Sequence, residues 1–207
     1  TELNVLTKFN PAVPDTFKAA SVVVLGNLAP ANQASVISQL TNSKALIILD
    51  TMNFWMDNTL TELLEVIKAV DVITINDEEA RQLTDESSLV VAARKIHEMG
   101  PKFVVIKKGE HGALLFNENN VFSAPALPLE AVFDPTGAGD TFAGGFSGYL
   151  TKTNDFSYEN MKRALIYGSA MASFCVEEFG PERLFKLQES DLENRLQAFK
   201  NLTQFEL

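Results

Sequence analysis

The sequence is poor in the residues that build disulfide frameworks and metal centres. Its 207 residues include a single cysteine, Cys175, and two histidines, His97 and His111. One cysteine excludes an internal disulfide and suits a reducing compartment, so we expect a cytoplasmic protein. The histidines are not spaced with Cys175 as metal ligands are, which leaves no zinc signature. Cys175 lies in an apolar helical stretch, where we expect it to pack in the core.

Long apolar runs and an excess of positive charge are also missing. The longest runs, residues 21–26 and 45–49, are far too short to cross a bilayer, and no charged-then-apolar leader precedes them. The formal net charge is −10. An acidic chain is repelled by phosphate backbones and anionic lipids, so we expect no nucleic-acid partner and no membrane attachment.

Several catalytic signatures are absent as well. The sequence contains no GxxxxGK[ST] phosphate loop, no GxGxxG after its first expected strand and no GxSxG elbow. Without the glycine fingerprint in the first turn, a dinucleotide-dependent Rossmann enzyme is excluded. The usual serine hydrolase arrangement is excluded for want of its nucleophile.

What is present is the pattern of an α/β protein. Hydrophobic residues make up 46% of the chain and charged residues 21%, as in a globular domain. Continuous apolar runs at 21–26 and 45–50 predict strands buried on both faces. Further strands are expected at 72–75, 103–107, 113–116 and 121–123, and helices at 32–40, 59–70, 88–99, 141–150, 158–176 and 190–199, with a short helix ending at Leu83. This alternation predicts parallel βαβ units, with helices on both faces of a mostly parallel sheet.

Polar side chains follow three of these strands. Asp50 and Asn53 come after the second strand, Asn76 and Glu79 after the third, and the segment 107–112 after the fourth. Each alone is read most simply as a helix cap or a turn residue. Ligands in such sheets bind beyond the carboxyl ends of the strands, so the convergence of these groups favours a phosphate-ligand site.

The segment around which the rest is organised is DPTGAGDTFAGGF, residues 134–146. Thr136, Gly137, Ala138 and Gly139 have small side chains or none, so their N–H groups can approach an anion closely. Apolar residues at helical spacing follow, and a turn that opens a helix is a ready anion site. Asp140 lies at this site. From the residue alone, a helix cap is its better explanation.

A carboxylate beside an anion-binding turn, with asparagine and glutamate suited to hydrated Mg²⁺, fits phosphoryl transfer to a hydroxyl group. That reaction needs a base for the alcohol, donors for the developing charge and a metal that bridges phosphates.

Residues 134–146 closely resemble the C-terminal signature of the PfkB/ribokinase family of ATP-dependent sugar and nucleoside kinases. Asn76-Asp-Glu-Glu79 resembles the family's NxxE element, Lys107-Lys-Gly-Glu-His-Gly112 its nucleotide-binding glycine turn, and residues 167–180 the helix and loop that close around adenine. The resemblance implies a three-layer α/β/α ribokinase-like fold, and it reverses the ranking for Asp140 from helix cap to catalytic base.

The resemblance also implies a role for each matching residue. Gly137, Ala138 and Gly139 would form the anion hole for the transferred phosphoryl group. Asn76 and Glu79 would act on Mg²⁺ through water. The nucleotide would be lined by Lys107, Gly109, Gly112 and Ser169. Asp134 and Thr136 stand where potassium-activated members hold K⁺, with the loop at 176–180.

One departure concerns the N-terminal part. The family's early strands and small β-lid, which covers the sugar and often forms a homodimer, have no counterpart here. We therefore expect residues 1–207 to be one nucleotide-binding and catalytic domain that is N-terminally incomplete. The expected reaction is transfer of the γ-phosphate of ATP to a sugar, at a primary hydroxyl. The alternatives are a nucleoside acceptor such as adenosine, or a catalytically silent nucleotide-binding module that regulates a partner.

Overall fold

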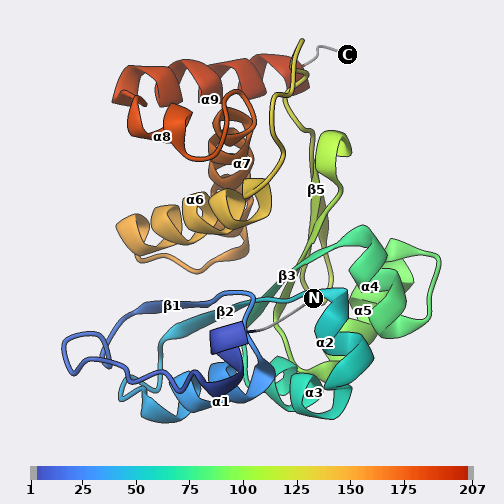
Figure 1. The fold of residues 1–207 in the computed structure, drawn as a ribbon. Coiled ribbons are helices and arrows are strands. Elements are labelled where there is room, and N and C mark those ends of the chain that lie inside the picture. Colours follow the sequence, from blue (N-terminus) through green and yellow to red (C-terminus); the bar gives the residue numbers. More distant parts are fainter. Residues whose placement is uncertain (1–3, 205–207) are drawn as a thin grey trace. The chain divides into compact units, whose positions relative to one another are not determined.

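The computed structural model describes residues 4–204 (Figure 1). The ends of the expected domain, residues 1–3 and 205–207, lie outside the described residues. The chain divides into two compact units, the first ending at Val105 and the second beginning at Ile106. The strands follow one another in the order β1-β2-β3-β4-β5-β6 in a mixed, six-stranded sheet, as expected for an α/β protein.

The first unit is built on three parallel strands. β1 (Val22–Leu25) pairs with β2 (Leu46–Asp50), and β2 pairs with β3 (Val72–Asn76). Ile48, Leu49, Ile73 and Ile75 are fully buried, which is why the central strands read as continuous apolar runs. Because β2 and β3 are parallel, their carboxyl ends point the same way. This places Asp50 and Asn76 at one edge of this part of the sheet.

Helices connect consecutive strands of the first unit, as the predicted βαβ pattern requires. The first unit contains a 3₁₀ turn, η1 (Asn4–Lys8), and the helices α1 (Pro30–Gln39), α2 (Asn53–Asn58), α3 (Leu60–Lys68), α4 (Asp77–Thr84) and α5 (Leu89–Met99). α1 and α3 pack side by side along the strands (Figure 1). Leu63 and Ile67 of α3 are fully buried, as their helical spacing predicts. The helix α2 was not predicted, because six residues are too few for a periodic pattern.

The expectation that the first strand is buried on both faces is wrong. β1 is the edge strand of the sheet, and the side chain of Val24 is 41% exposed. A run of β-branched residues shows that a segment favours extended backbone, but it does not show whether a second strand or a helix covers it. Burial at an edge depends on neighbours that the local sequence does not specify.

The second unit begins inside β4 (Phe103–Lys107). A 3₁₀ turn, η2 (Gly109–His111), leads into β5 (Ala113–Phe116), which forms an antiparallel hairpin with β6 (Val121–Ala124). The bounds of β4 and β5 are those predicted. Asn117 holds the hairpin turn, because its Oδ1 accepts from the N–H groups of Asn119 and Asn120 at 3.2 and 2.8 Å.

Four helices complete the second unit: α6 (Ala138–Thr153), α7 (Tyr158–Cys175), α8 (Glu182–Phe185) and α9 (Glu189–Thr203). α6 and α7 pack closely because glycine lies between them. A Cβ atom on Gly168 would lie 2.9 Å from the carbonyl oxygen of Phe142, and one on Gly145 would lie 2.8 Å from the Met171 side chain. Cys175 is buried, as predicted.

The helix α6 differs from its prediction in one respect that matters for the site. Apolar spacing placed its start at Thr141, whereas the helix begins at Ala138, so Asp140 lies in its first turn. None of the helices among residues 4–204 is both long enough and apolar enough to cross a membrane.

Candidate functional site

The turn after β4 contains one glycine that its surroundings require. Lys108 donates its N–H to the carbonyl oxygen of Gly112 at 2.8 Å and closes the turn. Gly112 has φ +87°, and a Cβ atom there would lie 2.1 Å from the carbonyl oxygen of Ala124. Gly109, at φ +54°, faces open space. Gly112 therefore allows the backbone of β6 and the loop after it to pass directly over the turn.

The turn that precedes α6 is organised by Asp134. Its Oδ1 accepts from the N–H of Thr136 at 2.9 Å. This backbone bond, joined by one from the Thr136 hydroxyl and one from the Gly180 N–H, holds the pKa of the Asp134 carboxyl below its usual range. Gly137 follows with φ +79° and is the N-cap residue of α6. The turn thus delivers the chain to the helix with a left-handed residue at the junction.

The first turn of α6 leaves backbone donors unused. The N–H of Ala138 is taken by the carbonyl oxygen of Pro135 at 3.2 Å. Those of Gly137, Gly139 and Asp140 have no acceptor among the described residues. Unpaired N–H groups at a helix start, together with the helix dipole, favour a bound anion. Of the residues predicted to bind an anion, Gly137 and Gly139 therefore have an unpaired N–H group, as does Asp140, whereas the N–H of Ala138 is already bonded.

A cationic side chain lies against the same turn. A Cβ atom on Gly139 would be 3.5 Å from Lys107 Nζ, so the ammonium group reaches the backbone of the second helical residue. A Cβ atom at position 139 would be in ordinary van der Waals contact with this group. Lys107 comes from the end of β4, and its placement joins the glycine turn after β4 to the start of α6.

Asp140 is not a helix cap in this structure. Gly137 is the N-cap residue, and no side chain caps the helix. The Asp140 side chain is exposed and makes no hydrogen bond or ion pair with any residue that the structure describes. The main structural explanation for Asp140, a helix cap, is therefore removed. A carboxylate that has no partner beside an anion site is available for chemistry.

One cavity of about 730 Å³ in the second unit collects most of the predicted nucleotide residues. Its walls include the following residues predicted from the sequence: Lys107, Gly109, Gly112, Ala138, Gly139 and Ser169. Its volume lies within the range of small-molecule sites. Asp134, Thr136, Gly137 and Asp140 are not among the lining residues.

Sequence reasoning missed the apolar wall of this cavity. The additional lining residues come from the loop after β6 and from the facing helices, and they include Ala126, Leu127, Pro128, Leu129, Phe142, Ala172, Ser173 and Val176. Pro125 and Pro128 mark this segment as a loop, and loops often carry binding residues. His111 also lies on the wall, with an exposed side chain.

Asn76 and Glu79 lie in the first unit and form a reciprocal capping box at the start of α4. Asn76 Oδ1 accepts from the N–H of Glu79 at 2.8 Å, and Glu79 Oε2 accepts from the N–H of Asn76 at 2.9 Å. The NxxE spacing is thus the spacing of a helix cap, as the simpler reading of Asn76 held. Glu79 is only 8% exposed, and its carboxylate is held in a single orientation.

The loop after α7 contacts the turn before α6. The carbonyl oxygen of Val176 accepts from the N–H groups of Phe133 and Asp134, at 2.8 and 3.4 Å. The two segments that the family resemblance linked to K⁺, residues 134–136 and 176–180, are therefore neighbours. Among residues 4–204 no group of three histidine, cysteine, aspartate or glutamate side chains converges on one point.

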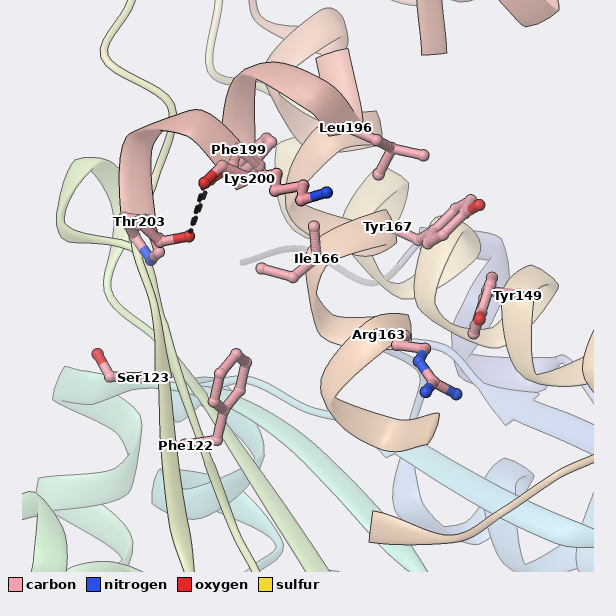
Figure 2. Close-up of a pocket in the computed structure, with 11 residues that line it drawn as sticks. Phe122, Ser123, Tyr149, Arg163, Ile166, Tyr167, Leu196, Phe199, Lys200 and Thr203 are labelled. Carbon is pink, nitrogen blue, oxygen red and sulfur yellow. Dashed lines mark hydrogen bonds between the residues drawn. The ribbon is translucent and has the colours of Figure 1, made fainter. Parts of the chain in front are cut away.

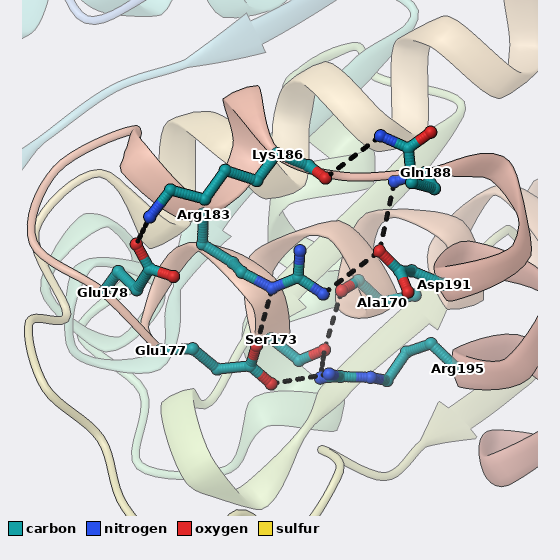
Figure 3. Close-up of polar contacts among 9 residues, drawn as sticks. All are labelled: Ala170, Ser173, Glu177, Glu178, Arg183, Lys186, Gln188, Asp191 and Arg195. Carbon is teal, nitrogen blue, oxygen red and sulfur yellow. Dashed lines mark hydrogen bonds and ion pairs between the residues drawn. The ribbon is translucent and has the colours of Figure 1, made fainter.

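A polar network ties this loop to the last helix (Figure 3). Arg195 of α9 donates to Ser173 Oγ at 2.8 Å and to a carboxylate oxygen of Glu177. Arg183 of α8 donates to the other oxygen of Glu177 and to Asp191, both at 3.3 Å. The Arg195 guanidinium carbon lies 3.8 Å from the ring centroid of Phe174. Because Ser173 also lines the cavity, α9 supports one of its walls.

Comparison with known proteins identifies a family. Residues 6–186 match the family model described as "pfkB family carbohydrate kinase". A cytidine kinase from Thermococcus kodakarensis is 32% identical over 143 residues, which is 66% of this chain and 50% of that protein.

Solved structures show the same fold. A putative ribokinase II from E. coli, in complex with ATP and Mg²⁺, has a TM-score of 0.71 at 22% identity and covers 88% of this chain and 60% of that one. Ribokinase from Arabidopsis thaliana, complexed with ribose and ATP, has a TM-score of 0.69 at 26% identity and covers 87% and 56%. The chain thus spans only half to three fifths of the length of these relatives. The ribokinase-like α/β fold predicted from the sequence is confirmed.

Proposed function

Because the chain belongs to the pfkB family of carbohydrate kinases, we propose that it is the catalytic portion of an ATP-dependent kinase acting on a primary hydroxyl of a sugar. The observation that carries the proposal is the state of Asp140. Its carboxylate is exposed, has no partner among the described residues and stands in the first turn of a helix, where the N–H groups of Gly137, Gly139 and Asp140 have no acceptor among those residues.

In the proposed reaction Asp140 is the general base. Its carboxylate accepts the proton of the acceptor hydroxyl as the oxygen forms a bond to the γ-phosphorus of ATP. The bond from that phosphorus to the bridging oxygen breaks, and ADP leaves. A base near a reacting hydroxyl contributes roughly 100- to 10,000-fold to such a step.

The start of α6 supplies the donors for the transferred group. Charge that develops on the phosphoryl oxygens is stabilised by the N–H groups of Gly137, Gly139 and Asp140 and by the Lys107 ammonium group next to Gly139. These groups are already in place, because Asp134 and the left-handed Gly137 hold the turn. The cavity beside them accommodates the nucleotide, with Gly109, Gly112 and Ser169 on its wall.

We assign Asn76 and Glu79 to the magnesium that accompanies ATP. Mg²⁺ neutralises phosphate charge and usually keeps several waters, with one or two protein carboxylates. The absence of a three-ligand cluster among residues 4–204 fits such a water-mediated role. The capping box fixes Glu79 in one orientation, so its carboxylate can receive hydrogen bonds from metal-bound water.

Asp134, Thr136 and the loop at 176–180 are the candidates for a monovalent cation. The lowered pKa of Asp134 keeps its carboxylate charged, and the adjacent loop contributes backbone carbonyl groups. If K⁺ binds here, activity will rise when K⁺ replaces a bulky organic cation such as choline at constant ionic strength.

A nucleoside is the second candidate acceptor. It is favoured by the 32% identity to a cytidine kinase over 66% of the chain. A nucleoside offers the same type of primary hydroxyl to Asp140, so the proposed chemistry is unchanged and only the acceptor pocket differs.

The test is phosphoryl transfer by the full-length protein to a panel of sugars and nucleosides, with Asp140→Asn as the key variant. We expect the variant to retain ATP binding and to lose about 100-fold or more in kcat. Undiminished turnover in Asp140→Asn contradicts the assigned base. ATP binding without transfer to any acceptor supports the regulatory module instead.

A further inference from the structure

A second cavity in the second unit, of about 460 Å³, shares no residue with the nucleotide cavity (Figure 2). We call it the aromatic groove. It is bounded by β6, α6, α7 and α9, and its lining residues are Phe122, Ser123, Pro125, Tyr149, Arg163, Ile166, Tyr167, Leu196, Phe199, Lys200 and Thr203. Its volume is sufficient for a molecule of two or three rings.

The lining of the groove is mostly apolar, and α7 and α9 each turn one face toward it. Arg163, Ile166 and Tyr167 of α7 are three and four residues apart, and so are Leu196, Phe199 and Lys200 of α9. Tyr149 and Tyr167 stack with their ring centroids 4.2 Å apart. In Figure 2 Phe122 and Ile166 point into the same space from opposite walls. Flat ligands bind well to such aromatic surfaces.

The charge of the groove has the opposite sign to that of the protein. Arg163 and Lys200 are its charged lining residues, in a chain whose net charge is −10. Neither forms an ion pair or a side-chain hydrogen bond with a residue that the structure describes. The neighbouring cation on α7, Lys162, differs in this respect, because it pairs with Glu159 at 2.7 Å while standing over the Phe122 ring.

Carboxylates are scarce around these two cations. No aspartate or glutamate is among the described residues that line the groove. Three acidic groups lie near its edge: Glu193 near Tyr167, Asp155 near Arg163, and Glu159, which is paired with Lys162 over the Phe122 ring. Two cations without ion-pair partners over an aromatic floor are complementary to a molecule with a flat apolar body and a negative group.

We propose that the aromatic groove binds a small aromatic anion, a carboxylate or a sulfonate, at a site separate from the nucleotide cavity. The rings of the ligand lie against Ile166 and Phe122, and its acidic group pairs with one of the two cations, Arg163 or Lys200, which stand at different ends of the groove (Figure 2). The proposal does not depend on the kinase activity, because no residue of the groove takes part in the proposed reaction.

The test uses 8-anilinonaphthalene-1-sulfonate, an aromatic sulfonate whose fluorescence rises on binding. We expect saturable binding of one equivalent that persists in the presence of saturating Mg²⁺-ATP. The double variant Arg163→Gln/Lys200→Gln should weaken it by roughly tenfold or more, because charge-assisted contacts are lost. Lys68→Gln/Lys152→Gln removes the same charge at two exposed lysines outside the groove and should bind like wild type.

A neutral probe separates charge from apolar contact. N-phenyl-1-naphthylamine has the same rings without the sulfonate, so its binding should be equal in wild type and in Arg163→Gln/Lys200→Gln. The proposal is overturned if the sulfonate binds equally to both double variants, or if ATP displaces it completely. Equal weakening of both probes in the groove variant also overturns it, because the loss would then not come from charge.

Discussion

Gly109 and Gly112 lie three residues apart in the turn after β4, yet their surroundings differ sharply. Both have positive φ, +54° and +87°. Only Gly112 has neighbours within reach of a Cβ atom, namely backbone atoms of residues 124–126 at 2.1 to 2.7 Å. Backbone cannot move aside as a flexible side chain does, so the two glycines make a matched pair for substitution.

We expect Gly112→Ala to lower the free energy of unfolding by roughly 2–5 kcal/mol, from backbone strain and overpacking together. Gly109→Ala should cost only about 1 kcal/mol, from the left-handed backbone alone. Urea unfolding of both variants measures the difference. Equal losses would show that the loop after β6 moves freely away from the turn.

At the scale of elements, substitution at the start of α4 can separate the helix cap from the proposed magnesium role. Asn76→Ala removes the cap and should cost about 1 kcal/mol in unfolding free energy. Glu79→Gln should leave stability almost unchanged, because glutamine also accepts in a capping box. If Glu79 also acts through magnesium, Glu79→Gln will need more Mg²⁺ for half-maximal activity. Wild-type Mg²⁺ dependence in a stable Glu79→Gln protein would confine Glu79 to the cap.

A second prediction at the scale of elements concerns the contact between α9 and α7, which we expect to affect both stability and ATP binding. The Arg195 side chain is 14% exposed and joins Ser173 to Glu177. Arg195→Met keeps the apolar stem on Phe174 but leaves Ser173 and Glu177 each without one partner. We expect a loss of about 1–3 kcal/mol in unfolding free energy and a higher dissociation constant for ATP, because Ser173 lines the cavity.

The control is Lys186→Met, which breaks the ion pair with Glu178 on the same network. Its lysine side chain is 61% exposed, so solvent screens the pair and we expect a change within about 0.5 kcal/mol. ATP affinity measured by calorimetry should fall in Arg195→Met alone. If both variants bind ATP like wild type, α9 does not support the cavity.

For the whole molecule, nucleotide binding should raise the free energy of unfolding, because a ligand that binds only the folded state shifts the unfolding equilibrium. At an ATP concentration of about 100 times Kd, the gain is roughly 2.7 kcal/mol. Asp140→Asn should show an equal or larger gain, since it removes a negative charge beside the phosphates. A wild-type protein that is not stabilised by Mg²⁺-ATP in thermal unfolding would contradict the nucleotide site.

Local sequence was sufficient to predict the bounds of an element where the flanking residues end it. β4 and β5 begin and end as predicted, because polar residues or glycine flank short apolar runs. It was insufficient at the start of α6, where the first helical turn contains small and charged residues that carry no apolar period. It also failed for β1, because exposure at a sheet edge depends on strand order.

Neighbouring residues alone indicated the features of the candidate site: a high density of glycine around Asp140, the capping spacing of Asn76 and Glu79, and strands that end in polar groups. These are properties of neighbouring residues, and elementary stereochemistry relates them to anion binding and to helix starts. The family likeness followed from the same motifs.

Tertiary structure decided which of these groups meet. It placed Lys107 beside Gly139, left Asp140 without a side-chain partner among the described residues, and built the cavity wall from a proline-flanked loop and the facing sides of α6 and α7. It also set Arg195 against Ser173 and exposed the aromatic groove. Contacts between residues far apart in the chain arise from the packing of whole elements, and no local pattern specifies them.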